Sequence, residues 1–354
     1  MTSGARRPAS RRSTGAARVT PASARPARPA WARPLRYNPL PPLIASPNAC
    51  LAHAVRRDLL DGDAGPARDL WALPEAGRLL RRQLPDGSWP YPGGGVPRYR
   101  EFEDYAQIET YRTLGILVEK FAATRRLAAL ERAAEFMFSR QTAAGDFRGI
   151  YGRQYTPNYT AGILELLVKA GYARDPRVQR AFAWLLHIRQ EDGGWAIPMV
   201  TRRGRWDQPS LSQPALAPDR SRPASHMVTG VVLRAFAAHP RYRRSTAARQ
   251  AAGLLADRLF SRDKYPGRDA PSFWFGFGFP FWFTDLLSAL DSLGRIGVPP
   301  GHAQVAEGLE WFIRAQSPDG TWRLHATRGS DPDTPLWISL AICRVFRRLA
   351  APGR

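Results

Sequence analysis

Apolar residues recur along most of the chain at intervals of three and four positions, the spacing that places them on one face of an α-helix. The stretch 104–121 is followed by 125–141, 158–171 by 175–190, 225–239 by 245–260, and 284–294 by 301–316. A pair near 46–61 and 67–84 and a last helix at 334–349 complete the series. Alternation typical of strands is absent over any useful length, so the pattern predicts an all-α protein.

The two members of each pair differ in character. The first helix is rich in small residues and apolar nearly all round, as in "NYTAGILELLVKAG", whereas the second carries a charged face, as in "DPRVQRAFAWLLHIRQ". This contrast is expected of an inner ring covered by an outer ring. The sequence therefore predicts an α/α toroid, a barrel of five to six helical hairpins with inner and outer helix rings, as a single domain over residues 37–354.

One turn recurs at the ends of the charged helices. "RRQLPDGSWPYP" at 81, "SRQTAAGDFRGIYG" at 139, "IRQEDGGWAIP" at 188 and "RAQSPDGTWRL" at 314 each run from Gln through a Gly turn to an aromatic residue. "LFSRDKYPGR" at 259 is a degenerate copy. We expect the Gln amide to bond free main-chain groups and the aromatic ring to pack on the neighbouring unit. The four pairs are Gln83/Trp89, Gln141/Phe147, Gln190/Trp195 and Gln316/Trp322.

The motifs "QLPDGSW", "QEDGGW" and "QSPDGTW" resemble the glutamine–tryptophan repeats of the terpenoid cyclase and protein prenyltransferase α/α-toroid superfamily, in particular those of squalene cyclase-like proteins. The resemblance covers about residues 40–350. It implies a hydrophobic, isoprenoid ligand and, in an active member, terpenoid cyclisation or prenyl transfer.

The sequence departs from the catalytic patterns of that superfamily. Squalene–hopene-type cyclases donate a proton from the middle aspartate of an Asp-x-Asp-Asp motif, which is missing here; "FPFWFTDLL" instead offers a lone Asp285. Prenyltransferases hold zinc through an Asp-x-Cys motif, and neither Cys50 nor Cys343 has an Asp two residues earlier. We predict no metal and no cofactor. Catalysis stays open, and the alternatives are a non-catalytic binding or interaction scaffold and a carbohydrate-active α/α barrel.

Candidate site residues lie near the starts of the predicted inner helices, which converge at one mouth of a toroid. Asp285 is the candidate acid, and Tyr159 or His226 would tune its acidity. Each of the three residues could instead have a purely structural role, at a helix start or in the core. Aromatic rings could stack on an isoprenoid chain or stabilise positive charge. The helix N-termini would also favour an anion such as diphosphate at this mouth. The candidate substrate-binding residues are Phe281, Trp282, Trp337 and Asp104.

The aromatic run "FWFGFGFPFWF" at 273–283 is the most unusual stretch of the chain. Gly276, Gly278 and Pro280 break it into a loop instead of a strand or a spanning helix. Three roles stay open for it: the wall of a pocket, a plug that fills the barrel, and a peripheral membrane contact.

Composition and charge narrow the class of protein. The formal charge of +22 comes almost wholly from arginine, since only three lysines are present, and nine arginines fall in residues 1–36. We interpret 1–36 as a disordered Arg/Pro/Ala-rich tail, and specific nucleic-acid binding is not favoured. Two distant cysteines and the lack of a secretion signal or a long apolar segment indicate a cytoplasmic protein. The sequence predicts neither the substrate nor the oligomeric state.

Overall fold

The computed structural model describes Met1 and residues 28–92, 103–204, 209–267, 269–327 and 331–349. These residues form fourteen α-helices with isolated β-bridges and no strand, so the predicted all-α class is confirmed. The helices are α1 (Leu40–Ile44), α2 (Ala49–Leu59), α3 (Arg68–Trp71), α4 (Pro74–Leu80), α5 (Tyr105–Glu119), α6 (Ala128–Ser139), α7 (Pro157–Leu167), α8 (Pro176–His187), α9 (Pro198–Arg203), α10 (His226–Ala238), α11 (Thr246–Asp257), α12 (Leu286–Ile296), α13 (Ala303–Arg314) and α14 (Thr334–Leu349).

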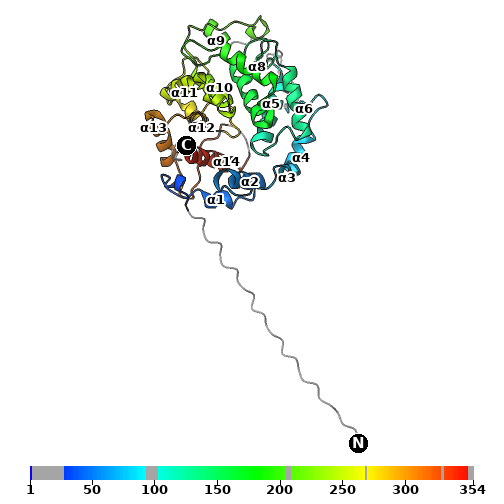
Figure 1. Ribbon diagram of the computed structural model, residues 1–354, viewed down its shortest axis with the longest axis vertical. Helices are drawn as coiled ribbons and strands as arrows, with labels where there is room; N and C mark the ends of the chain where they lie inside the picture. Colours follow the sequence, from blue (N-terminus) through cyan, green and yellow to red (C-terminus); the bar gives the residue numbers. More distant parts are fainter. Residues whose placement is uncertain (2–27, 93–102, 205–208, 268, 328–330, 350–354) are drawn as a thin grey trace.

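The helices lie in an inner and an outer layer, as the pairing in the sequence predicts. Figure 1 shows α10, α12, α14 and α5 toward the middle of the molecule and α11, α13 and α6 at its periphery. Twelve of the thirteen residues of α10 are buried, whereas α8 buries only one face. A helix that is apolar all round must be covered on all sides, which explains the inner position of α10.

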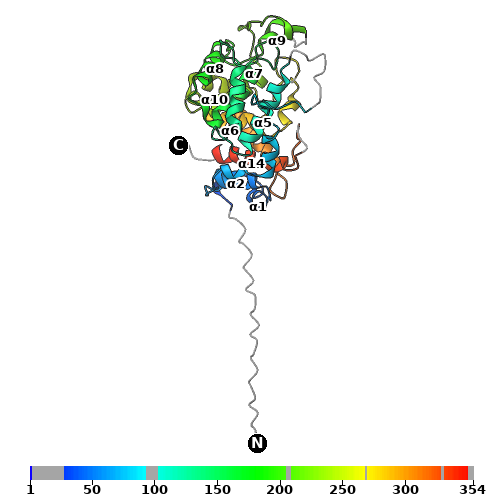
Figure 2. The same ribbon diagram turned by 90° about the vertical axis from the view of Figure 1, so that its right-hand side faces the viewer.

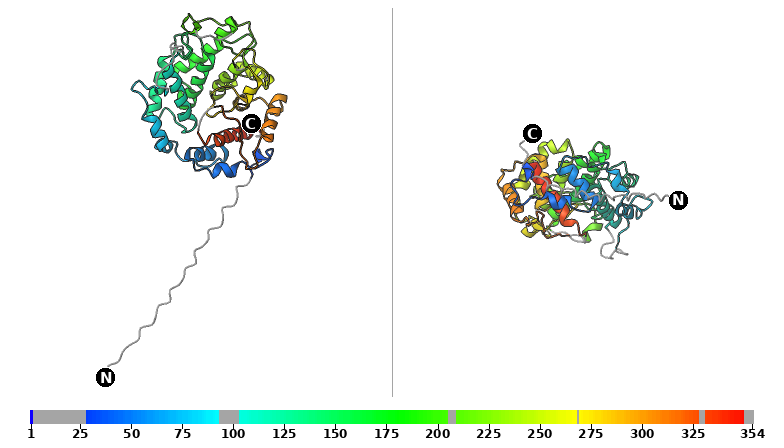
Figure 3. Two further views of the ribbon diagram at one scale, coloured as in Figure 1. Left: turned by 180° about the vertical axis from the view of Figure 1, so that it is seen from behind. Right: turned by 90° about the horizontal axis from the view of Figure 1, so that it is seen from below.

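The inner helices pack side by side in an order set by the chain. α7 contacts α5 and α10, α12 contacts α10 and α14, and α14 contacts α2. Figure 2 shows α14 beside α2 from the side, and the view from behind in Figure 3 shows the red C-terminal helix next to the blue N-terminal helices. As a result, α14 near the C-terminus lies against α1 and α2 near the N-terminus.

Short polar side chains fix where the inner helices begin. Asp104 caps α5 by accepting a hydrogen bond from the Gln107 amide, and Ser225 caps α10 through the Val228 amide. Such caps satisfy main-chain N–H groups that have no partner within the helix. They also fix which side chains stand at the ends of the inner helices.

The predicted helix at 67–84 is broken in the structure. α3 ends at Trp71 and α4 begins at Pro74, because Pro74 disfavours helical geometry at the residue before it and fits the first position of a new helix. Leu73 accordingly takes an extended conformation. The segment still covers α5, since the Trp71 indole donates a hydrogen bond to the Phe121 carbonyl.

The four repeated turns share a set of hydrogen bonds. Each turn aromatic is buried, and its main-chain N–H donates to a hydroxyl on the following inner helix. In three turns the Gln side-chain amide donates to the carbonyl of the turn glycine and to a second main-chain carbonyl: that of Ala129 near the start of α6, of Arg177 near the start of α8, or of Tyr37 before α1. Gln190 instead donates to the carbonyls of Asp219 and Arg222. These bonds tie each outer helix to the next unit. The hydroxyl acceptors are Thr110, Thr160, Thr229 and Ser339.

The last turn joins the two ends of the domain. The Gln316 side chain donates to the Tyr37 carbonyl at 3.0 Å and accepts from the Tyr37 amide at 2.9 Å. Gly320 lies so close to Asn38 that a Cβ there would stand 2.3 Å from the Asn38 carbonyl oxygen. Leu35, which the sequence places in the tail, is buried at 3% exposure. The segment 28–36 is therefore packed on the domain.

No helix in the described ranges is long and apolar enough to cross a membrane.

Replacing Trp195 tests the role of the turns. Its ring is fully buried, and its indole N–H donates to the Leu185 carbonyl at 2.7 Å. Trp195→Ala should lower the free energy of unfolding by about 3–5 kcal/mol, as expected when a large core side chain is removed. Denaturant melts measure this, with Trp195→Phe as a milder control that keeps most of the buried ring. A loss below about 1 kcal/mol for the alanine variant would contradict the packing described.

Two truncations test the boundary of the domain. Deleting residues 2–27 should leave the melting temperature nearly unchanged, because these residues lack the apolar side chains needed for packing. Deleting 2–36 should lower it by a few degrees, because the burial of Ala32 and Leu35 is lost. Equal melting temperatures for the two truncated proteins would show that 28–36 adds nothing to stability.

Candidate functional site

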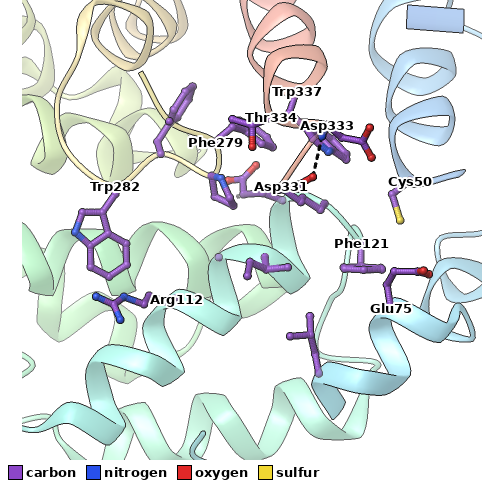
Figure 4. Close-up of a pocket in the computed structure, with 18 of the residues that line it drawn as sticks. Cys50, Glu75, Arg112, Phe121, Phe279, Trp282, Asp331, Asp333, Thr334 and Trp337 are labelled. Atoms are coloured by element: carbon purple, nitrogen blue, oxygen red, sulfur yellow. Dashed lines mark hydrogen bonds and ion pairs between the residues drawn. The ribbon is translucent and has the colours of Figure 1, made fainter. Parts of the chain in front are cut away.

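A cavity of about 1440 Å³, which we call the chamber, is lined at one side by residues at the starts of α2 and α14. It continues between α4, the second half of α5 and the loop 276–283, which we call the aromatic loop. Figure 4 shows Trp282 and Arg112 at one end, and Cys50, Glu75 and Phe121 at the other. The chamber is thus bounded by segments from both halves of the chain.

The aromatic loop is held at both ends. The Phe277 amide donates to the His325 carbonyl at 3.0 Å, and the Thr327 amide donates to the Phe277 carbonyl at 2.8 Å. At the other end, Thr284 packs on Gly230 of α10 so closely that a Cβ there would lie 2.4 Å from its side chain. These contacts direct the intervening aromatic residues inward.

The aromatic loop forms one wall of the chamber, and its rings also fill part of the space between the inner helices. Phe279 stacks on Trp337 with 5.3 Å between ring centroids, and Trp282 packs on Tyr111 at 4.5 Å. The Arg112 guanidinium lies 5.4 Å from the Trp282 ring. Each ring from Phe273 to Phe283 is buried or half-buried. The rings leave a large cavity beside them, so the loop does not close the chamber.

Asp285 follows the aromatic loop and lines the chamber while capping α12. Its Oδ1 accepts from the Ser288 amide at 2.7 Å, and the Ser288 hydroxyl accepts from the Asp285 amide at 3.0 Å. Burial raises the pKa of Asp285 to about 7, against the hydrogen bonds of Ser288 and the nearby charge of Arg234. A carboxyl group that holds a proton near neutral pH therefore borders an aromatic cavity.

A buried network of charges lies beside this acid. Glu165 on α7 accepts from Arg234 Nε at 2.8 Å and from Lys169 Nζ at 2.6 Å. Although burial acts in the opposite direction, the charges of Arg234 and Lys169 hold the pKa of Glu165 below its ordinary value. Burial raises the pKa of the neighbouring Tyr111, which keeps its phenol neutral. The surroundings of Glu165 and Asp285, two carboxyl groups that line the chamber, thus shift their pKa values in opposite directions.

The opposite end of the chamber is polar. Lys120 pairs with Asp331, and the Asn48 amide donates to Asp333 Oδ2 at 2.6 Å while its carbonyl oxygen caps α2. Asp331, Asp333 and Thr334 stand at the start of α14 and line the cavity. Sequence reasoning missed them, although "DPDT" at 331–334 carries two of the three aspartates of an Asp-x-Asp-Asp pattern at the start of an inner helix.

The structure brings together four of the seven predicted site residues. These four line the chamber: Phe281, Trp282, Asp285 and Trp337. Tyr159 lies behind Trp282, with 6.1 Å between ring centroids, and is not among the lining residues. It contacts the wall of the chamber instead of forming it.

His226 and Asp104 lie elsewhere, so the expectation that they share this cavity is corrected. The His226 ring stacks on Trp274 at 5.1 Å, and its Nδ1 lies 3.9 Å from Asp263, because α10 begins against the segment 261–275. Asp104 caps α5 and pairs with Arg140 at 2.9 Å. The groups that surround Asp285 are Ser288 and Arg234, not His226.

The chamber has more carboxyl than cationic side chains, which does not suit the diphosphate that the sequence led us to expect. Six carboxyl side chains line it against four cationic ones, and two of those cations, Arg112 and Lys120, lie over aromatic rings. Arg153 does not line the cavity, and Arg98 and Arg100 fall outside the described residues. This balance favours a neutral or transiently cationic ligand over a polyanion. The described residues contain no group of three or more His, Cys, Asp or Glu side chains arranged to hold a metal ion.

Comparison with known proteins gives no family. No family model matches the chain, and neither does a curated protein. A solved protein from Actinoplanes is 18% identical, covers 86% of this chain and 90% of its own, and has a TM-score of 0.40. The type II terpene cyclase MstE from Scytonema is 14% identical over 79% of this chain and 96% of its own, with a TM-score of 0.31. A polysaccharide lyase is 13% identical over 87% and 92%, with a TM-score of 0.39. These values assign no activity to this chain.

The raised pKa of Asp285 predicts a pH-dependent stability. Because the folded state binds this proton more tightly than the unfolded state, the contribution is full below about pH 4 and is lost as the pH rises to about 7. The difference in unfolding free energy between the native protein and Asp285→Asn should fall by about 4 kcal/mol between those pH values, at roughly 1.4 kcal/mol per pH unit. Denaturant melts of both proteins measure it. A difference that stays constant with pH would show that Asp285 titrates normally.

Proposed function

We propose that the protein binds a hydrophobic, isoprenoid-type ligand in the chamber and that Asp285 protonates it, in a terpenoid cyclase-like reaction. The observation that supports this most directly is a carboxyl group with a pKa of about 7 at the edge of an aromatic cavity. A proton held at this position can add to an alkene or an epoxide. The chamber is larger than the range of about 300–1,000 Å³ typical of small-molecule pockets, which suits a long ligand.

The aromatic rings have a role in this chemistry. Protonation of an alkene creates a carbocation, which must be stabilised and kept away from water. Trp282, Phe279 and Trp337 line the cavity, and cation–π attraction is worth about 0.5–2 kcal/mol per contact. The excess of carboxyl groups in the lining acts in the same direction.

The structure offers less support to the two alternatives. A filled barrel would favour a scaffold, whereas this one keeps a cavity of about 1440 Å³. Asp104, a candidate carboxylate from the sequence, is paired with Arg140 outside the lining, so it cannot act with Asp285 on a carbohydrate in this cavity. Hydrophobic-ligand binding is therefore the function that the geometry supports best.

Two matched aspartate variants test the proposal with squalene and geranylgeraniol as probes. Asp285→Asn should bind the probes within about threefold of the native protein, measured by quenching of tryptophan fluorescence, because size and polarity are kept. Its turnover, measured by gas chromatography and mass spectrometry, should fall about 10²–10⁴-fold, the usual contribution of a positioned acid. Asp333→Asn, the control from the other end of the chamber, should keep turnover within about tenfold.

The outcomes separate the parts of the proposal. Full activity in Asp285→Asn would remove Asp285 as the acid, and activity lost only in Asp333→Asn would move the role to Asp333. A native protein that binds neither probe would exclude an isoprenoid ligand. Tighter binding of geranylgeranyl diphosphate than of geranylgeraniol would contradict the charge argument.

A further inference from the structure

Two carboxyl groups of the chamber are held in opposite states by their surroundings. Asp285 is buried next to aromatic side chains and accepts a main-chain hydrogen bond from Ser288, whereas Glu165 accepts from two cations, Arg234 and Lys169. Both groups line the same cavity. Arg234 also contacts the Phe283 carbonyl at 3.4 Å, two residues before Asp285, so one side chain links both sites. A pair of carboxyl groups whose environments differ in this way is the usual sign of an acid and a base that act together.

We infer that Glu165 is the base that removes a proton from the cationic intermediate at the end of the reaction, a role that rests on the proposed function. Nothing in the sequence pattern singles it out, because it stands on the apolar inner helix α7. Its carboxylate is 4% exposed and borders the chamber without facing bulk solvent.

Within one turnover the atoms balance between these two groups, and Asp285 regains a proton from water before the next turnover. The O–H of Asp285 gives its proton to one alkene carbon of the ligand, the π electrons form the new C–H bond, and the other carbon becomes cationic. Further double bonds of the chain attack this centre and close rings. Glu165 then takes a proton from a carbon next to the final cation, and the electrons of that C–H bond form a double bond. Protons next to a carbocation are very acidic, so even a weakly basic carboxylate accepts them. The product is an isomer of the substrate.

The proton taken by Glu165 has a route out of the molecule. Lys169 bridges Glu165 Oε1 at 2.6 Å and Glu119 Oε1 at 2.5 Å. Glu119 and Lys169 also line a second cavity of about 720 Å³, bordered by residues near the C-terminal ends of α2, α5, α12 and α14. Lys169 can pass one proton to Glu119 while it accepts one from Glu165, so its own charge does not change. Glu119 borders both cavities, which makes it the exit to solvent.

The test replaces Glu165 and examines products of squalene instead of rate alone. Glu165→Gln keeps the size of the side chain but removes the base. Squalene consumption should stay within about tenfold of the native protein, because the first proton comes from Asp285. The products should shift from the native alkene to alcohols formed by water capture or to other alkene isomers. Glu135→Gln, which removes a surface carboxylate paired with Arg177, is the control and should leave the products unchanged.

A second variant guards against misfolding, because Glu165→Gln leaves the buried Arg234 and the half-buried Lys169 with fewer partners. In the double variant Glu165→Gln with Lys169→Met, one of those cations is removed, and the same shift in products is expected. An unchanged product profile in a folded variant would overturn the role of Glu165 while leaving Asp285 as the acid. A native protein that does not consume squalene or geranylgeraniol would overturn the inference together with the proposed function, and Asp285→Asn would then show no difference either.

Discussion

The ion pair between Arg234 and Glu165 is the interaction on which the centre of the molecule depends. It joins α10 to α7, the two inner helices with the most extensive mutual packing, and its two partners are buried. Arg234 also bonds the main chain of the aromatic loop. Burying such a pair carries a large desolvation cost, and the loss of either partner would leave an unpaired charge. This cost limits how the loop and α12 can sit, and therefore fixes where Asp285 enters the chamber.

At the periphery of the molecule, the main-chain groups at the helix ends have no partners within their own helix. The repeated turns supply these partners from Gln side chains and inner-helix hydroxyls. The side chains between the inner helices are therefore not needed to hold neighbouring units together. A cavity lined by aromatic side chains can then persist in the middle of a well-packed all-helical protein.

How well the sequence predicts a feature of this structure depends on how far apart in the chain the interacting residues lie. Helices with a strong periodic pattern, such as 225–239, depend on local spacing and are found close to their predicted bounds. Asp285 was expected at a helix start because Thr284 and an apolar run flank it, and it is indeed a cap. His226 shares that local signature, yet it faces Trp274 because of packing by a loop far along the chain. The pairing of Glu165 with Arg234 spans 69 residues, so no local pattern could reveal it.

The link between the aromatic loop and the chamber explains why a single run of sequence has several physical roles. Phe277 and Trp274 are core residues, Phe279 and Trp282 form the wall, and Asp285 begins a helix.

A crystal structure with bound geranylgeraniol would test the central claim most directly. Our account predicts that the chain lies against Trp282 and Phe279, with an alkene carbon within about 3–3.5 Å of the Asp285 carboxyl group, the range of a reactive contact. A ligand bound outside the chamber, or one whose double bonds cannot approach Asp285, would contradict it.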